Sequence, residues 1–235
     1  MSIPKLIHYC WFGPDPIPQR DLDFIKEWSQ VNPDFTVVFW NEDNFDVNCS
    51  IYSRLAYAEK QWVALSAFAR ICVLCKYGGV YLDTDMMLIK PLRLACLQDS
   101  FFAGFKSETR VSASVLGSIP KHTLLRDMLA WYQDNPGSYL SCAALLTATL
   151  RYRFGLKENG QLQLFDEGIR ISPIHVFYPP VNLETGKLEL QDDTISLNHA
   201  NFTLGSSSLL RQIFSRYRGV SKGLDKEIHK VITKS

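Results

Sequence analysis

The sequence lacks long hydrophobic runs and an excess of charge of one sign. No segment reaches the roughly 18 consecutive apolar residues of a membrane-spanning helix, and the first residues lack the apolar stretch of a secretory signal. Lysine and arginine total 25 against 24 aspartate and glutamate, which gives a formal net charge of +1. A chain so close to neutral is not built as a bulk nucleic-acid binder. These absences predict a cytoplasmic protein without a nucleic-acid partner.

The sequence also lacks the cysteine spacing of a secreted disulfide framework, although it contains 6 cysteines. Its composition is that of an ordinary globular protein, with 46% hydrophobic and 21% charged residues. That composition excludes disordered, collagen-like and coiled-coil proteins. A chain of 235 residues can bury enough surface in one core to be stable without crosslinks. We therefore expect reduced thiols and a single domain over residues 1–235.

Hydrophobic patterning predicts alternating strands and helices in the first third of the chain. Strands are expected over 4–12, 35–40 and 80–85, and helices over 21–30, 50–60 and 62–77. This order predicts an α/β fold whose mainly parallel, Rossmann-like sheet is flanked by helices, with ligands bound beyond the carboxyl ends of the strands. The less regular remainder predicts helices over 124–133 and 141–152, short strands over 169–199 and a basic helix over 209–235.

The strongest chemical signal is the segment Tyr-Gly-Gly-Val-Tyr-Leu-Asp-Thr-Asp at 77–85. On a strand, Tyr81, Asp83 and Asp85 share one face. Two carboxylates that converge at a strand end raise the cost of ionising each other, and Mg²⁺ or Mn²⁺ relieves that cost. The alternative is an exposed Asp-x-Asp loop that binds nothing. The apolar helix and the Gly-Gly break before the pair favour a site for metal and phosphate.

Arg70 lies in the middle of the otherwise apolar helix expected over 62–77. A buried guanidinium needs a partner, because burying an unpaired charge is costly. A diphosphate matches its fork of donors, and an ion pair with Asp83 is a compatible alternative. Trp11, at the end of the first expected strand, fits either stacking on a nucleobase or a core position, which composition alone favours.

Three segments resemble the family 32 glycosyltransferases. They are Ile-Pro-Lys-Leu-Ile-His-Tyr-Cys-Trp-Phe-Gly at 3–13, Ser-Ala-Phe-Ala-Arg at 66–70 and Lys-Tyr-Gly-Gly-Val-Tyr-Leu-Asp-Thr-Asp at 76–85. These enzymes occur in bacterial capsule and O-antigen synthesis and are related to yeast mannosyltransferases and glucosylating toxins. The resemblance is specific over 3–105, with weaker landmarks at 177–179 and 194–199. It implies a GT-A fold, a UDP- or GDP-sugar donor and retention of the anomeric configuration.

The resemblance also implies roles for individual residues. Trp11 would stack on the base, and Arg70 would contact the sugar or phosphates of the donor. Asp83 would contact the ribose or sugar and reach Mn²⁺ or Mg²⁺ through water, and Asp85 would bind the metal directly. Tyr81 is expected at the same donor site, and His199 as a further metal or diphosphate ligand. We expect residues 1–105 to bind donor and metal, 106–208 to bind the acceptor, and 209–235 to form a basic helical tail.

The sequence departs from the family in two places. Ala67 stands where the family has an aspartate three residues before Arg70, which removes a donor contact and leaves Arg70 less well held. The family's His-His-x-x-x-Ser-Trp region reads Asn-His-Ala-Asn-Phe-Thr-Leu at 198–204, so the tryptophan and first histidine are missing. A loop position is the other interpretation of His199.

These features favour a metal-dependent retaining glycosyltransferase that transfers a sugar to a glycan or lipid-linked glycan in bacterial surface polysaccharide synthesis. The main alternative is a nucleotide-sugar-binding protein with weak or no activity, which Ala67 supports. Metal-dependent nucleotidyl transfer ranks lower, because the next acidic residue after Asp85 is Asp99. The basic segment 209–235 is either a contact with anionic lipid at the inner face of the membrane or a solvated helical face.

Overall fold

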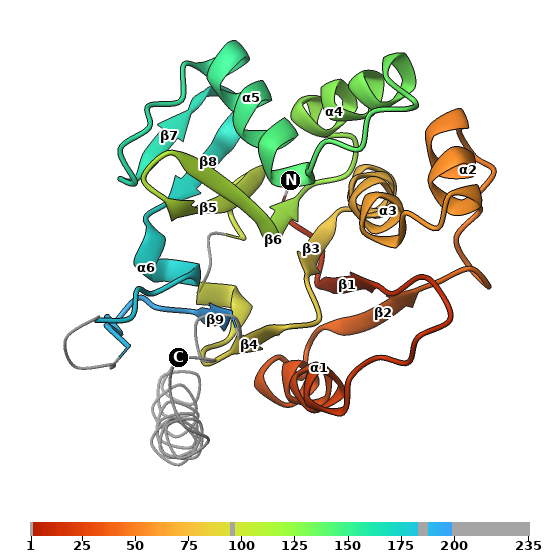
Figure 1. Cartoon of the computed structure of the whole chain (residues 1–235). Helices are drawn as coiled ribbons and strands as arrows, with labels where there is room; N and C mark the ends of the chain where they lie inside the picture. Colours follow the sequence, from red (N-terminus) through yellow and green to blue (C-terminus); the bar gives the residue numbers. More distant parts are fainter. Residues whose placement is uncertain (1, 95–96, 183–187, 199–235) are drawn as a thin grey trace.

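The computed structural model describes residues 2–94, 97–182 and 188–198 (Figure 1). The expected basic helix over 209–235 and the expected ligand His199 lie outside these ranges. No helix within the described ranges is long and apolar enough to span a bilayer.

A seven-stranded sheet forms the centre of the described chain, in the order β2-β1-β3-β6-β5-β8-β7. Its strands are β1 (Leu6–Cys10), β2 (Thr36–Trp40), β3 (Gly79–Leu82), β5 (Phe101–Ser107), β6 (Arg110–Ser118), β7 (Gln163–Phe165) and β8 (Ile169–Ser172). β1 pairs in parallel with β2 and β3, and β5 with β8, whereas β6 is antiparallel to β3 and β5, and β7 to β8. Only β6 and β7 therefore run against the other strands of this sheet, which confirms the expected mainly parallel arrangement.

Helices cover both faces of the sheet. They are α1 (Gln19–Val31), α2 (Ile51–Ala58), α3 (Trp62–Tyr77), α4 (Thr123–Asp134), α5 (Cys142–Phe154) and the single turn α6 (Ile174–Phe177). Figure 1 shows α2 to α5 on one side of the sheet and α1 on the other. Two buried clusters follow this division: Leu65 and Phe68 of α3 belong to one, and Trp28 of α1 and Phe177 of α6 to the other.

The turn from α3 into β3 requires two glycines. Gly78 has φ +65°, and its amide donates to the carbonyl of Leu74 at 2.8 Å, so it ends the helix. Gly79 has φ +104°, and a Cβ there would lie 2.8 Å from the carbonyl oxygen of Leu6 in β1. Only glycine therefore allows β3 to lie this close to β1.

A buried histidine fixes the same corner of the sheet. His8 Nε2 lies 2.9 Å from the carbonyl oxygen of Gly78, and Trp40 Nε1 donates to His8 Nδ1 at 3.1 Å. The tryptophan can only donate, so the ring carries its proton on Nε2 and donates it to Gly78. Burial lowers the pKa of His8 and keeps the ring neutral.

The expectation of a strand over 80–85 is wrong at its end. β3 stops at Leu82, and Asp83, Thr84 and Asp85 form a turn closed by a hydrogen bond from the Met86 amide to the Asp83 carbonyl at 3.0 Å. The chain then enters β4 (Met86–Leu88), which pairs antiparallel with β9 (Ser196–Asn198) in a separate ribbon. The Asp83 amide still donates to the carbonyl of Ser114 in β6 at 2.9 Å, and the chain leaves the sheet after this bond.

Candidate active site

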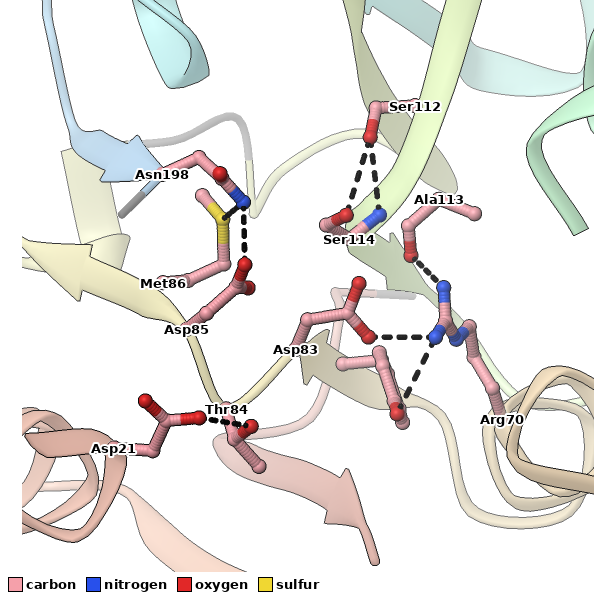
Figure 2. Close-up of polar contacts among 11 residues, drawn as sticks. Asp21, Arg70, Asp83, Thr84, Asp85, Met86, Ser112, Ala113, Ser114 and Asn198 are labelled. Carbon is pink, nitrogen blue, oxygen red and sulfur yellow. Dashed lines mark hydrogen bonds and ion pairs between the residues drawn. The ribbon is translucent and has the colours of Figure 1, made fainter. Parts of the chain in front are cut away.

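The turn at 83–85 lies beyond the carboxyl end of β3, and each of its side chains contacts a different part of the fold (Figure 2). Asp83 faces α3, Thr84 faces α1, and Asp85 faces β9. Because the two acids are on a turn, their position does not come from strand alternation as expected. It comes from three sets of contacts made by distant segments.

Arg70 and Asp83 form a partly buried ion pair, in which the arginine is the buried partner. Arg70 Nη2 lies 2.6 Å from Asp83 Oδ1, and Arg70 Nη1 donates to the carbonyl of Ala113 in β6 at 2.6 Å. Arg70 is only 8% exposed, and its Nε has no hydrogen-bond partner among the described residues. The ion pair expected as one partner of Arg70 is therefore present, and one donor of the guanidinium remains unused.

Tyr81 lies beneath Arg70 and not on the surface. The guanidinium carbon is 4.2 Å from the centre of the Tyr81 ring, a cation–π distance. Tyr81 is buried in the cluster under α3, whereas Val80 and Leu82 belong to the opposite cluster. The expected alternation thus holds up to Leu82, and Tyr81 supports Arg70 from below. Direct contact of Tyr81 with a donor stays a prediction.

Asp85 is held by an amide from the second ribbon. Asn198 Nδ2 donates to Asp85 Oδ2 at 3.1 Å, and Asn198 is 4% exposed. Burial raises the pKa of Asp85, and the negative charge of Asp83 adds to the rise. Sequence reasoning recorded Asn198 only as a lost family histidine. The antiparallel pairing of β4 with β9 brings it to the acidic turn.

The two carboxylates are of the chemical type that a hard divalent cation prefers. Both present oxygen ligands, and Asp85 carries a charge that its surroundings disfavour and that a cation would stabilise. Among the described residues, no cluster of three or more acidic, histidine or cysteine side chains surrounds a metal position. A cation held by Asp83 and Asp85 would therefore complete its coordination with water and substrate phosphates, as Mg²⁺ commonly does.

Helix α1 holds the middle of the turn. Thr84 Oγ1 donates to Asp21 Oδ2 at 2.9 Å, and Asp21 is 3% exposed and also paired with Arg20 at 2.6 Å. Trp28 Nε1 donates to the carbonyl of Met86 at 2.8 Å, directly after the turn. Figure 2 shows Asp21 and Thr84 on the side of the turn away from Asn198. Sequence reasoning missed Asp21, whose only signal was an acid on the buried side of an expected helix.

The structure also places Trp11 and Ala67. Trp11 directly follows β1 at the same edge of the sheet, is half-buried, and donates from Nε1 to the carbonyl of Asp15 at 2.7 Å. Ala67 is 5% exposed and lies one helical turn before Arg70. The structure thus places Trp11 and the acidic turn after the carboxyl ends of two parallel strands, and Arg70 on the neighbouring helix α3. The roles of these residues in binding stay predictions.

Comparisons with known proteins address the family. Residues 18–103 match the family model "Glycosyltransferase sugar-binding region containing DXD motif". An uncharacterized glycosyltransferase of Acanthamoeba polyphaga mimivirus is 30% identical over 132 residues, which cover 51% of each chain. The human alpha-1,4-N-acetylglucosaminyltransferase is 35% identical over 84 residues, which cover 35% of this chain and 23% of that enzyme. The chain thus spans about half or less of the length of these relatives.

Among solved structures, the PaToxG glycosyltransferase covers 64% of this chain and 69% of its own, with a TM-score of 0.54 and 17% identity. At that identity the likeness concerns the fold alone, and it agrees with the expected GT-A architecture. The matched range contains Asp21, Arg70, Asp83 and Asp85. The resemblance to the family 32 glycosyltransferases is thereby confirmed, since residues 18–103 match the model of the glycosyltransferase sugar-binding region that contains the DXD motif.

Proposed function

We propose that this chain transfers a sugar from a nucleotide-sugar donor to an acceptor hydroxyl group, with Mn²⁺ or Mg²⁺ held by Asp83 and Asp85. One observation carries the proposal: two carboxylates share a turn beyond β3, one paired with a buried arginine and the other with its pKa raised by burial. A cation held at this turn would lie near the guanidinium of Arg70, so that both would contact the same bound ligand. A nucleoside diphosphate is the ligand class that suits both.

Each residue has a distinct task in this proposal. When bound, the cation supplies positive charge that stabilises a departing diphosphate. Arg70 adds a second positive charge, and Asp83 and Ala113 hold it in one orientation, so it need not reorganise during the reaction. Trp11 stacks on the nucleobase. The acceptor hydroxyl reacts through positioning, since sequence reasoning found no nucleophile or Ser-His-Asp arrangement.

The finer assignments follow from the family resemblance. We infer a UDP- or GDP-sugar donor, retention of the anomeric configuration, and a glycan or lipid-linked glycan acceptor in bacterial surface polysaccharide synthesis. We place the reaction in the cytoplasm at the inner face of the membrane, with the basic segment 209–235 resting on anionic lipid. Flotation of the chain with anionic liposomes, with and without 209–235, tests the lipid contact. Equal flotation of both forms would remove it.

A donor panel tests the main proposal. The chain is incubated with Mn²⁺ and UDP-glucose, UDP-N-acetylglucosamine or GDP-mannose, and melting temperature and donor hydrolysis are measured. One donor is expected to raise the melting temperature through ligand linkage, and Asp85→Ala is expected to abolish both the rise and hydrolysis. Asp134→Ala, at the exposed end of α4, serves as the matched control that keeps both. Hydrolysis that persists in full with the metal chelated would contradict the proposal.

The second candidate is a nucleotide-sugar-binding protein without transferase activity. Two observations favour this function: Nε of Arg70 has no partner among the described residues, and position 67, one helical turn away, is an alanine. An aspartate at position 67 would hold Arg70 more tightly. Ala67→Asp discriminates the two functions. Hydrolysis by this variant but not by the wild type supports the binding protein, whereas hydrolysis by the wild type excludes it.

A further inference from the structure

Two cysteines line one cavity on the α2 side of the sheet, away from the acidic turn. The cavity has a volume of about 410 Å³, and Cys49 and Cys72 both contribute to its wall. Cys49 directly precedes Ser50, the N-cap of α2, and Cys72 belongs to α3. Both are free thiols, and Cys49 is exposed whereas Cys72 is half-buried. A small molecule in solvent can therefore reach Cys49, and Cys72 faces the same space.

The packing of neighbouring rings brings these two cysteines together. Phe45 and Tyr52, which flank Cys49 in the sequence, both pack against Phe68 of α3, with ring centroids 6.4 Å and 5.4 Å apart. Phe68 also lines the cavity, and Cys72 follows it four positions later on the same face of the helix. The segment that carries Cys49 therefore lies against α3 beside the turn that carries Cys72.

The surroundings of Cys49 favour its thiolate form. Cys49 Sγ lies 3.7 Å from the hydroxyl oxygen of Ser53 in the first turn of α2, where the helix dipole also stabilises negative charge. Hydrogen bonds from Cys72 and Ser53 lower the pKa of the Cys49 thiol to about 6, although burial and the charge of Asp46 oppose the shift. The hydrogen bond with Cys49 raises the pKa of Cys72. The pair is thus an accessible thiolate with a protonated thiol beside it.

This arrangement is typical of redox-sensing cysteines, which are accessible thiolates placed next to a second thiol. We propose that Cys49 is a site of oxidation by hydrogen peroxide, and that Cys72 converts the oxidised product to a reversible disulfide. In the first step the Cys49 thiolate attacks one peroxide oxygen and the O–O bond breaks. Cys49 becomes a sulfenic acid, and the departing hydroxide takes up a proton and leaves as water.

In the second step Cys72 loses its proton and attacks the Cys49 sulfur, and the S–O bond breaks with release of a second water. Oxidation of Cys49 removes the thiolate whose hydrogen bond and charge raise the pKa of Cys72, so Cys72 deprotonates more readily after the first step. The two thiols together lose two hydrogen atoms, and one peroxide is reduced to two waters. The crosslink joins the segment before α2 to α3, and a dithiol reductant restores both thiols.

Peptide mapping of the full chain tests the site. The reduced chain is treated with hydrogen peroxide at neutral pH, the remaining thiols are blocked with iodoacetamide, and the chain is digested without reduction. We expect a crosslinked pair of peptides that contain Cys49 and Cys72, and we expect dithiothreitol to separate them. In Cys72→Ser the crosslink is absent, and dimedone, which traps sulfenic acids, is expected to label Cys49.

Cys75→Ser is the matched control. Cys75 is half-buried on the same helix as Cys72, but it is not among the described residues that line the cavity. This variant is expected to form the crosslink between Cys49 and Cys72 as the wild type does. In the reduced wild type, iodoacetamide is expected to alkylate Cys49 several-fold faster than Cys75, because burial raises the pKa of Cys75. Unfolding in urea is expected to abolish this difference.

Several results in the wild-type chain would overturn the proposal, so it does not depend on the folding of any variant. They are alkylation of Cys49 no faster than that of Cys75, a disulfide that joins Cys49 to a cysteine other than Cys72, and oxidation of Cys49 without any disulfide. A crosslink that forms equally well in urea would overturn it too, because the fold would then have no part in pairing the thiols. Each measurement is made without a nucleotide sugar, so its outcome is independent of the proposed function.

Discussion

The two aspartates of the turn are expected to have opposite effects on stability in the metal-free protein. Asp83 neutralises Arg70, which is nearly inaccessible, whereas Asp85 is a half-buried acid whose pKa is raised by burial and by the charge of Asp83. Asp83→Asn therefore leaves a buried cation without its counter-charge. Asp85→Asn removes a disfavoured charge and keeps an oxygen that can accept from Asn198.

The magnitudes follow from burial. Breaking a buried ion pair typically costs about 3–5 kcal/mol. The Asp83 side chain is 30% exposed, and Arg70 keeps its bond to Ala113, so we expect Asp83→Asn to lower the free energy of unfolding by less. About 2–3 kcal/mol is our expected loss, after discounting for solvent screening. Asp85→Asn is expected to leave the free energy unchanged or to raise it, because its pKa is raised in the fold.

Urea unfolding of both variants at neutral pH, with EDTA present, measures this difference. In a second series with Mn²⁺ in place of EDTA, we expect the metal to stabilise the wild type but neither variant. An equal loss of unfolding free energy in Asp85→Asn and Asp83→Asn would contradict the opposite effects expected of the two acids. An Asp83→Asn variant as stable as the wild type would contradict them as well.

Three further predictions concern the surroundings of the turn. Burial depresses the pKa of His8 below its ordinary 6.5, so as the pH falls the unfolded chain binds a proton at His8 before the folded protein does. The stability contributed by neutral His8 is therefore full above pH 6.5, and it is lost as the pH drops from 6.5 through the depressed pKa of the folded state. Equal urea midpoints at about pH 5 and about pH 7.5 would contradict this pH dependence. Thr84→Val loses the bond to Asp21, so we expect it to lower the free energy of unfolding by about 1 kcal/mol and to weaken Mn²⁺ binding, whereas Thr84→Ser keeps the wild-type stability and affinity. Mn²⁺ binding is measured from the electron paramagnetic resonance signal of free Mn²⁺. Wild-type Mn²⁺ affinity in Thr84→Val would refute a role of Thr84 in placing the turn. In Gly79→Ala, the new side chain meets a backbone φ of +104° and a carbonyl oxygen 2.8 Å from its Cβ. We therefore expect the free energy of unfolding in urea to fall by about 2 kcal/mol or more. A variant as stable as the wild type would contradict this strain.

The sequence predicts α3 at both ends, because its signals are local. A helix that is apolar nearly all round runs from Trp62 to Tyr77, and a glycine in the capping position follows. The partner of Arg70 is predictable for a similar reason, since a buried guanidinium demands a counter-charge and Asp83 is near in sequence. These predictions need no knowledge of distant segments.

The end of β3 is not predictable in this way. Asp83, Thr84 and Asp85 continue the alternating pattern of Val80 to Leu82, so a strand and a strand followed by a turn have the same signature. The difference lies in α1, where Asp21 binds Thr84 from 63 positions upstream. Patterning within a short window contains no such information.

The β5–β6 hairpin is not among the predicted strands, and it contains two glycines. Gly104 and Gly117 lie inside strands, where glycine is locally unfavourable. A Cβ on Gly104 would lie 2.5 Å from Phe177, and one on Gly117 would lie 1.9 Å from Phe102. Both glycines are thus required by rings that pack over the strands, a requirement visible only in the folded protein.

The ribbon of β4 and β9 has a consequence for the order of assembly. Asn198 binds Asp85 across 113 positions, so the environment of that acid is complete only after almost the whole described chain has been synthesised. Closing so large a loop is slow compared with forming α3 or pairing β1 with β2. An intermediate in which α3 and β3 are already formed would therefore hold Arg70 against Asp83 while Asp85 still faced water. Competence to bind a metal is expected to appear last as the protein folds.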